Sequence, residues 1–163
     1  SSTNNINAYD PYIQGCSAYL EGTREGYEKA ITLFDRALKV DKNYALALAS
    51  KAESQALLAF ELSRNDEPFK QMEKEAESNS KLALKINPKS SNVLRAMSLI
   101  LFSQGNNEES LNYANKAIKL NPNDPEAYYW RFYNNNNRKD LNKALDLNPF
   151  LVSANESLAE LYR

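Results

Sequence analysis

The stretch SNVLRAMSLILFSQGNNEESLNYANKAIKLNPND, residues 91–124, contains two helical patterns and two breaks. Apolar residues recur at helical spacing over 93–102 and again over 111–120. Gly105 and the Gln and Asn residues around it separate the two patterns, because glycine and asparagine tolerate the left-handed backbone at which helices end. Pro122 ends the second pattern, since proline disfavours helical geometry in the residue before it. The stretch therefore predicts a hairpin of two helices joined by a tight turn.

The ending of the second helix recurs along the chain. Residues 37–42, 83–88, 117–122 and 144–149 each read as a small residue, an apolar one, a charged one, an apolar one, Asp or Asn, and a stop. The stop is proline in every copy except the first, which has lysine. Four copies of one ending in a chain of 163 residues indicate an internal repeat, as in stacked helical hairpins.

These repeats resemble the tetratricopeptide repeat, a helix–turn–helix unit with a period of about 34 residues. Ala83 and Ala117 are 34 residues apart, and so are Pro88 and Pro122. The first copy has GYEKAI at 26–31, which is similar to the second helix of the family's repeat. The individual motifs are degenerate, and the resemblance is carried by their repetition in register.

The resemblance implies an all-α fold, a right-handed superhelix of stacked antiparallel helix pairs. We expect a flexible polar leader over 1–8 and a single domain over 9–163, with residues 10–11 (Asp-Pro) beginning the first helix. Hairpins are expected at about 9–43, 44–90, 91–124 and 125–149, followed by a capping helix over 150–163.

Two of the hairpins depart from the period. Ala37 and Ala83 are 46 residues apart, and Ala117 and Ala144 are 27 residues apart. The second hairpin is therefore expected to have longer helices than the family's repeat. The fourth is expected to be short and to leave neighbouring helices partly uncovered.

Composition narrows the classes of function. The net charge is −1, from 20 basic and 21 acidic residues, which gives no general attraction to nucleic acid or to an anionic membrane. No apolar run approaches the roughly 18 residues that a membrane span requires. The chain has no histidine, and its single cysteine, Cys16, cannot form an intramolecular disulfide. A reducing, cytoplasmic location is favoured, with a bacterial periplasm or envelope as the alternative.

The sequence contains no pattern typical of catalysis. It has only 4 glycines and no Gly-rich phosphate loop, and Cys16 has no histidine to activate it. We therefore expect a non-enzymatic protein with no cofactor and no metal site, in which Cys16 packs as a thiol.

In the resembled family, the first helices of successive hairpins line a concave groove that receives a peptide or a partner helix. Carried over by register, the expected groove residues are Tyr12, Tyr19, Ser50, Glu53, Asn92, Arg95, Leu99, Phe102, Tyr129, Trp130 and Tyr133. Aromatic residues and arginine supply many interface hot spots, and Arg95 is the candidate anchor for a carboxylate. The alternative is that some of these aromatics pack against the neighbouring helix.

The resemblance implies a protein-interaction module, an adaptor or assembly scaffold whose partner is a protein or peptide. The alternatives are an assembly lipoprotein tethered to an envelope through the polar leader, and the helical regulatory part of a larger enzyme. The family members that grip acidic chaperone tails use a clamp of Lys, Asn and Arg. This chain has Ser50 and Ala96 at the matching places and Arg95 one residue off, so that role is not expected.

A homo-oligomer through the fourth hairpin is also a candidate. Tyr129, Trp130 and Tyr133 lie in the shortened copy, and exposed aromatic patches often mark interfaces. This interpretation predicts that Trp130→Ala weakens partner binding or self-association more than it weakens folding.

Overall fold

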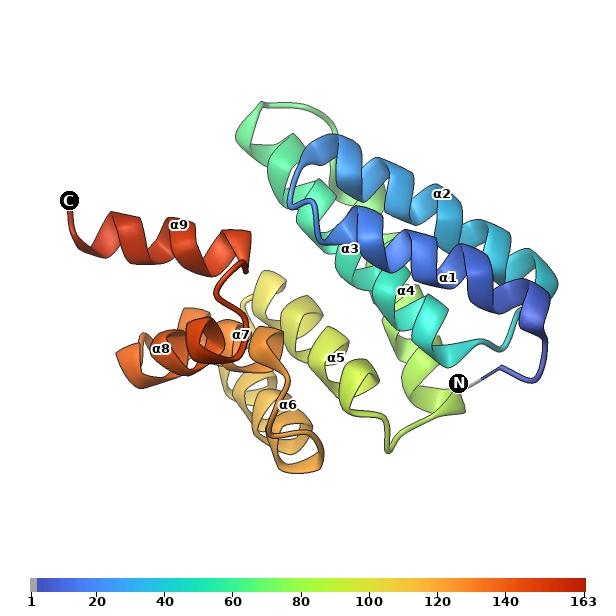
Figure 1. Ribbon diagram of the computed structural model, residues 1–163. Helices are drawn as coiled ribbons and strands as arrows, with labels where there is room; N and C mark the ends of the chain where they lie inside the picture. Colours follow the sequence, from blue (N-terminus) through green and yellow to red (C-terminus); the bar gives the residue numbers. More distant parts are fainter. Residues whose placement is uncertain (1–2) are drawn as a thin grey trace.

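The computed structural model describes residues 3–163, a range that contains helices and no strand (Figure 1). The helices are α1 (Ile6–Tyr19), α2 (Arg24–Val40), α3 (Ala45–Arg64), α4 (Lys70–Ile86), α5 (Ser91–Ser103), α6 (Asn107–Leu120), α7 (Pro125–Asn135), α8 (Arg138–Leu147) and α9 (Val152–Leu161). From α1 to α8 they pair as antiparallel hairpins, and successive hairpins stack on one another. The expected all-α superhelix of stacked hairpins is therefore confirmed.

The four recurring helix endings adopt one geometry. In each copy the backbone N–H of the Asp or Asn donates to the carbonyl of the alanine four residues earlier. This distance is 2.9 Å in all four pairs, Asp41–Ala37, Asn87–Ala83, Asn121–Ala117 and Asn148–Ala144. The four alanines are fully buried, at 0 % exposure. A larger side chain at these positions would overpack a closely filled interior, which explains the small residue in every copy.

The chain enters its first helix earlier than expected. Asn5 caps α1, because its side chain accepts a hydrogen bond from the backbone N–H two residues later, and Ala8 is fully buried. Pro11 lies inside α1 and does not open it. The flexible leader predicted for 1–8 is thus wrong for 6–8, since the cap and the buried alanine order this segment. The first two residues of that leader lie outside the described residues.

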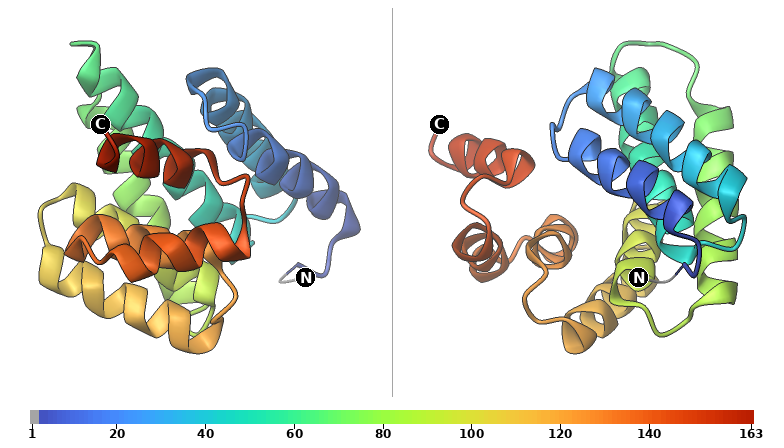
Figure 2. Two further views of the ribbon diagram at one scale, coloured as in Figure 1. Left: turned by 60° about the vertical axis from the view of Figure 1, so that its left-hand side comes forward. Right: turned by 45° about the vertical axis from the view of Figure 1, so that its right-hand side comes forward.

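The helices differ in length where the repeat spacing differs. α3 has 20 residues, whereas α7 has 11 and α8 has 10. α3 ends in a turn at which Asp66 adopts a left-handed conformation, with φ of 57°. The long α3 brings its last turns, which include Phe60 and Arg64, to the concave side of the stack. The short α7 and α8 are followed by a loop that sets α9 off from them (Figure 2).

The two ends of the stack meet. The hydroxyl of Tyr19 in α1 donates to the carboxylate of Glu126 in α7 at 2.7 Å. The side chain of Val152, at the start of α9, lies beside Gly22 in the turn between α1 and α2. α9 therefore faces the end of the first hairpin and the long α3, and the concave surface lies between them (Figures 1 and 2).

Candidate functional site

The concave surface holds a groove of about 370 Å³. Most of its walls come from α3, α5, α7 and α9, which are far apart in the sequence, and Gly22 and Tyr27 of the first hairpin complete them. The groove-lining residues are Gly22, Tyr27, Ala56, Leu57, Phe60, Glu61, Arg64, Leu99, Phe102, Ser103, Tyr129, Trp130, Tyr133, Ser153, Glu156, Ser157 and Glu160. This volume is within the range of about 300–1,000 Å³ that is usual for ligand-binding clefts.

One side of the groove is aromatic. The ring of Phe102 in α5 meets the ring of Tyr133 in α7 edge-on, with centroids 5.5 Å apart. Phe60 in α3 is 54 % exposed and Tyr133 is 46 % exposed, which is high for large apolar side chains. Arg64 lies over the ring of Phe60, 5.8 Å from its centroid. The aromatic side of the groove consists of Phe60, Phe102, Tyr129, Trp130 and Tyr133.

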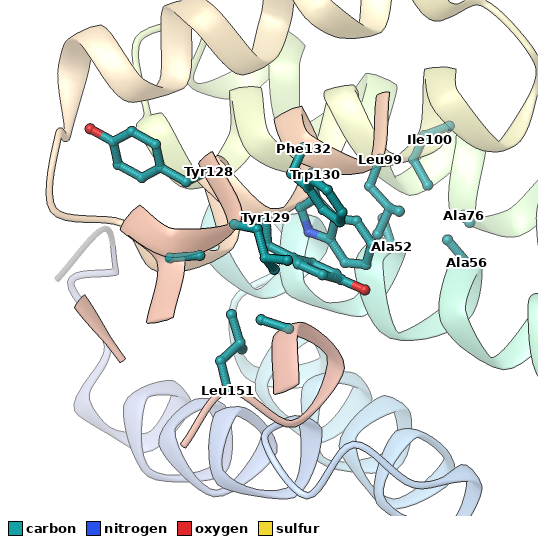
Figure 3. Close-up of a cluster of buried hydrophobic side chains, with 13 residues drawn as sticks. Ala52, Ala56, Ala76, Leu99, Ile100, Tyr128, Tyr129, Trp130, Phe132 and Leu151 are labelled. Carbon is teal, nitrogen blue, oxygen red and sulfur yellow. The ribbon is translucent and has the colours of Figure 1, made fainter. Parts of the chain in front are cut away.

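The base of the groove is fixed by packing between α7 and its neighbours (Figure 3). Tyr129 and Trp130 are only 5 % and 8 % exposed, and their ring centroids are 4.8 Å apart. The hydroxyls of Tyr129 and Ser157 lie 3.1 Å apart and share a hydrogen bond, which ties α7 to α9. Leu151 and Ala154 are also buried in this cluster and hold the start of α9. The base of the groove is therefore part of the largest hydrophobic core.

Beside the groove, a buried ion-pair network joins three hairpins. Arg95 in α5 donates twice to Glu53 in α3, at 2.9 and 2.8 Å, and once to Asp124 at the start of α7, at 2.8 Å. Glu53 is 1 % exposed and Asp124 is 5 % exposed. Asp124 also accepts hydrogen bonds from the backbone N–H groups of Glu126 and Ala127, which caps α7. One guanidinium thus compensates two buried carboxylates and sets the position of a helix.

Burial raises the pKa of Glu53 to about 7. Arg95 opposes this shift, and the negative charges of Glu126 and Asp124 add to it. For Arg95, burial lowers the pKa, but the Glu53 and Asp124 carboxylates outweigh that effect and hold it well above its usual value. Arg95 therefore stays charged, and Glu53 is the member of the network that titrates near neutral pH.

This pKa predicts that the protein becomes less stable as the pH rises from 5 to 8. In the unfolded chain, Glu53 titrates near its ordinary pKa of about 4.3. Between pH 4.3 and 7, the folded protein therefore keeps the Glu53 carboxyl protonated while the unfolded chain has lost that proton. Its contribution to stability is complete below about pH 4 and is lost as the pH rises through 7, a change of up to about 4 kcal/mol. Denaturant unfolding at pH 5, 6, 7 and 8 would measure it. Glu53→Gln should flatten the profile, and an equal slope in that variant would show that another group is responsible.

In the structure, some of the predicted groove residues line the groove, some form polar contacts beside it, and some lie elsewhere. Leu99, Phe102, Tyr129, Trp130 and Tyr133 do line the groove. The predicted residues outside its lining are Tyr12, Tyr19, Ser50, Glu53, Asn92 and Arg95. Among these, Glu53 and Arg95 pair with each other, and Tyr19 bonds to Glu126.

The remaining three residues lie elsewhere. Tyr12 packs in a buried cluster of the first hairpin, against the rings of Phe34 and Tyr44, with centroid distances of 6.0 and 4.9 Å. Ser50 and Asn92 are half-buried. Burial raises the pKa of the Cys16 thiol, which fits a packing role for this residue.

The structure corrects two of these interpretations. Arg95 is not available as a carboxylate anchor, because its guanidinium N–H groups already donate to the carboxylates of Glu53 and Asp124. Trp130 and Tyr129 do not form an exposed aromatic patch for self-association, because α5 and α9 pack over them; only Tyr133 of the three is exposed.

Sequence reasoning missed the walls of the groove contributed by the end of α3 and by α9. Phe60 and Arg64 follow Leu57 at helical spacing, so extending the register along the long α3 would have found them. The α9 residues carried no comparable signal, since the position of α9 depends on the preceding loop and on contacts with distant helices.

A family model described as a TPR repeat matches residues 99–131. This segment covers the end of α5, all of α6 and the start of α7, and so includes the helix ending at 117–122. This segment of the chain is a tetratricopeptide repeat. No curated protein sequence matches it significantly.

Solved tetratricopeptide-repeat structures are similar in fold to most of the chain. The Sgt2 TPR domain from Aspergillus fumigatus aligns with a TM-score of 0.60 and 17% identity, over 88% of this chain and 86% of that one. The first TPR of Spaghetti (RPAP3), bound to the HSP90 peptide SRMEEVD, aligns with a TM-score of 0.56 and 17% identity, over 83% and 95%. A thermophilic TPR protein of Thermus thermophilus aligns with a TM-score of 0.50 and 20% identity, over 94% and 97%. At these identities the likeness concerns the fold.

Two further features of the described residues concern membrane spans and metal sites. Between residues 3 and 163, no helix is long and apolar enough to span a membrane. Within the same range, no three His, Cys, Asp or Glu side chains gather in a way that would hold a metal ion.

Proposed function

We propose that this tetratricopeptide-repeat protein is a non-catalytic interaction module, an adaptor or assembly scaffold. It binds a short segment of a partner protein in the groove between α3, α5, α7 and α9. The observation that carries this proposal is the aromatic side of the groove, where Phe60 and Tyr133 remain 54 % and 46 % exposed. Large apolar side chains at a concave surface are typical of binding sites, because a partner that covers them removes apolar area from water.

The ligand in the Spaghetti structure supports a peptide partner for this fold, but an acidic tail does not suit this chain. Ser50 and Ala96 stand at the places where an acidic-tail clamp would have lysine, asparagine or arginine. Arg95, which precedes Ala96, is buried against Glu53 and Asp124. The partner segment is therefore expected to bind along the aromatic side of the groove without a carboxylate clamp.

Replacing both Phe60 and Tyr133 by alanine should weaken partner binding by about tenfold or more, since central aromatic contacts dominate interface energies. Because both side chains are substantially exposed, the variant should still fold, which its helical circular dichroism would show. The measurement is capture of partners from the source organism's lysate, followed by titration of the captured partner against both proteins.

The matched control is Phe150→Ala with Tyr162→Ala. These substitutions remove the same two side-chain types at positions that are 87 % and 78 % exposed and lie outside the groove lining. A partner lost from the groove variant and kept by this control supports the proposal. Equal retention of all partners by the groove variant would contradict it.

A further inference from the structure

The groove has a polar, acidic wall opposite its aromatic side. α9 contributes Ser153, Glu156, Ser157 and Glu160, which share one face of that helix. Glu156 and Glu160 are exposed, one helical turn apart, and neither has an ion-pair partner among residues 3–163. A ligand in the groove would therefore meet apolar side chains on one side and carboxylates on the other.

The charge within the groove is unbalanced. Its lining includes three carboxylates, of Glu61, Glu156 and Glu160, and one guanidinium, that of Arg64. Arg64 lies 3.9 Å from Glu61 and offsets one of these charges, which leaves the carboxylates of Glu156 and Glu160 uncompensated within the lining. The net negative charge favours a cationic ligand and disfavours an anionic one.

The carboxylates of the groove contribute to the raised pKa values of two tyrosines that line it. Burial raises the pKa of Tyr27 to about 12, and the charges of Glu126, Glu61 and Glu156 add to that effect. Burial also raises the pKa of Tyr129 to about 12, with Glu156 again among the groups that disfavour the phenolate. Carboxylates on both α3 and α9 thus act across the groove.

A hydrogen-bond donor is buried at the base of the groove. Trp130 is 8 % exposed, and its indole N–H has no acceptor among the described residues. A buried donor without an acceptor is costly, but the indole nitrogen has almost no accessible surface, so a ligand oxygen reaches it only if the indole turns toward the groove. Among the groups of a protein segment, a backbone carbonyl or a hydroxyl would satisfy this donor.

We propose that the groove binds a basic amphipathic helix of a partner protein, with its apolar face on the aromatic side and lysine or arginine residues facing Glu156 and Glu160. This inference rests on the proposed function and gives the chemistry of the partner. α9 has 10 residues, or about 15 Å of helix, so two to three turns of the partner fit along it. Cationic side chains four residues apart on the partner match the spacing of the two glutamates.

The test uses three labelled 11-residue peptides built on one pattern of leucines, with lysine, glutamine or glutamate at every polar position. Fluorescence anisotropy at low salt gives the affinity of each for the protein. The lysine peptide should bind about 5- to 10-fold more tightly than the glutamine peptide, and the glutamate peptide most weakly. The preference should shrink at high salt, because the glutamates are exposed. The emission of Trp130, the only tryptophan in the chain, should change when the lysine peptide binds.

Matched variants locate the interaction. Glu156→Gln with Glu160→Gln should remove the preference for the lysine peptide. Glu108→Gln with Glu109→Gln makes the same change in charge on α6, outside the groove lining, and should leave the preference intact. Equal loss in both variants would overturn the inference, because it would indicate a general effect of net charge.

The outcomes separate this inference from the proposed function. If the glutamine peptide binds as tightly as the lysine peptide, and both need Phe60 and Tyr133, the basic partner is wrong but the groove remains a binding site. If the lysine peptide binds equally well without those aromatics, the amphipathic mode is wrong. If none of the three peptides binds, the inference falls, and capture of groove-dependent partners from the lysate decides the proposed function separately.

Discussion

Arg95→Ala is expected to lower the free energy of unfolding by about 3–5 kcal/mol at pH 7, the cost of breaking a buried ion pair by removing one partner. The substitution leaves Glu53 and Asp124 buried at 1 % and 5 % exposure with no guanidinium to compensate them. It also removes the contact that orients Asp124, which caps α7. Denaturant unfolding followed by circular dichroism would measure the loss.

Arg24→Ala is the matched control. Arg24 also donates to a glutamate through two nitrogens, to Glu67 at 2.6 and 3.1 Å, but both side chains are 40 % exposed. Solvent screens exposed pairs and leaves them little net stabilisation, so this variant should lose far less stability than Arg95→Ala. The loss in Arg95→Ala should also shrink at pH 5, where Glu53 is protonated and carries no charge that needs a partner. An equally small loss in both variants at pH 7 would show that solvent compensates the buried carboxylates.

The features that the sequence predicted correctly are local. The helix endings at Ala83 and Ala117 depend on a few neighbouring residues. Each copy of the pattern therefore forms the same helix end and buries the same alanine. The stacking of hairpins follows, because one hairpin cannot cover its own apolar face. The aromatic side of the groove was also partly predictable, since Phe102 and Tyr133 lie in register on the first helices of their hairpins.

The features that were missed depend on distant contacts. Glu53 and Arg95 are 42 positions apart, and both were assigned to the groove, but their register alone did not show that they would pair with each other. Opposite charges at neighbouring places in successive repeats were the available signal. The acidic wall could not be predicted, because the position of α9 depends on Leu151 and Ala154 entering the core beneath α7.

Trp130→Ala is expected to lower the free energy of unfolding by about 3–5 kcal/mol, the usual cost of truncating a large aromatic residue in a core. The sequence had suggested a mainly interfacial role, but Trp130 is 8 % exposed and packs with Tyr129, Phe132 and Leu99 in the largest buried cluster. Its loss would leave a cavity between α5, α7 and α9. Thermal and denaturant unfolding would measure the effect, and α9 should become more susceptible to proteolysis than α1.

Two companion variants test the physical reason for that loss. Tyr133→Ala removes the neighbouring but 46 % exposed aromatic residue and should stay within about 1 kcal/mol of the unchanged protein. Trp130→Phe should lose less than Trp130→Ala, because it keeps a ring in the core and removes an indole N–H that has no acceptor among the described residues. If Trp130→Ala cost no more than Tyr133→Ala, Trp130 would not be a core residue. In that case α9 would be loosely held, and the acidic wall of the groove would be a mobile element rather than a fixed one.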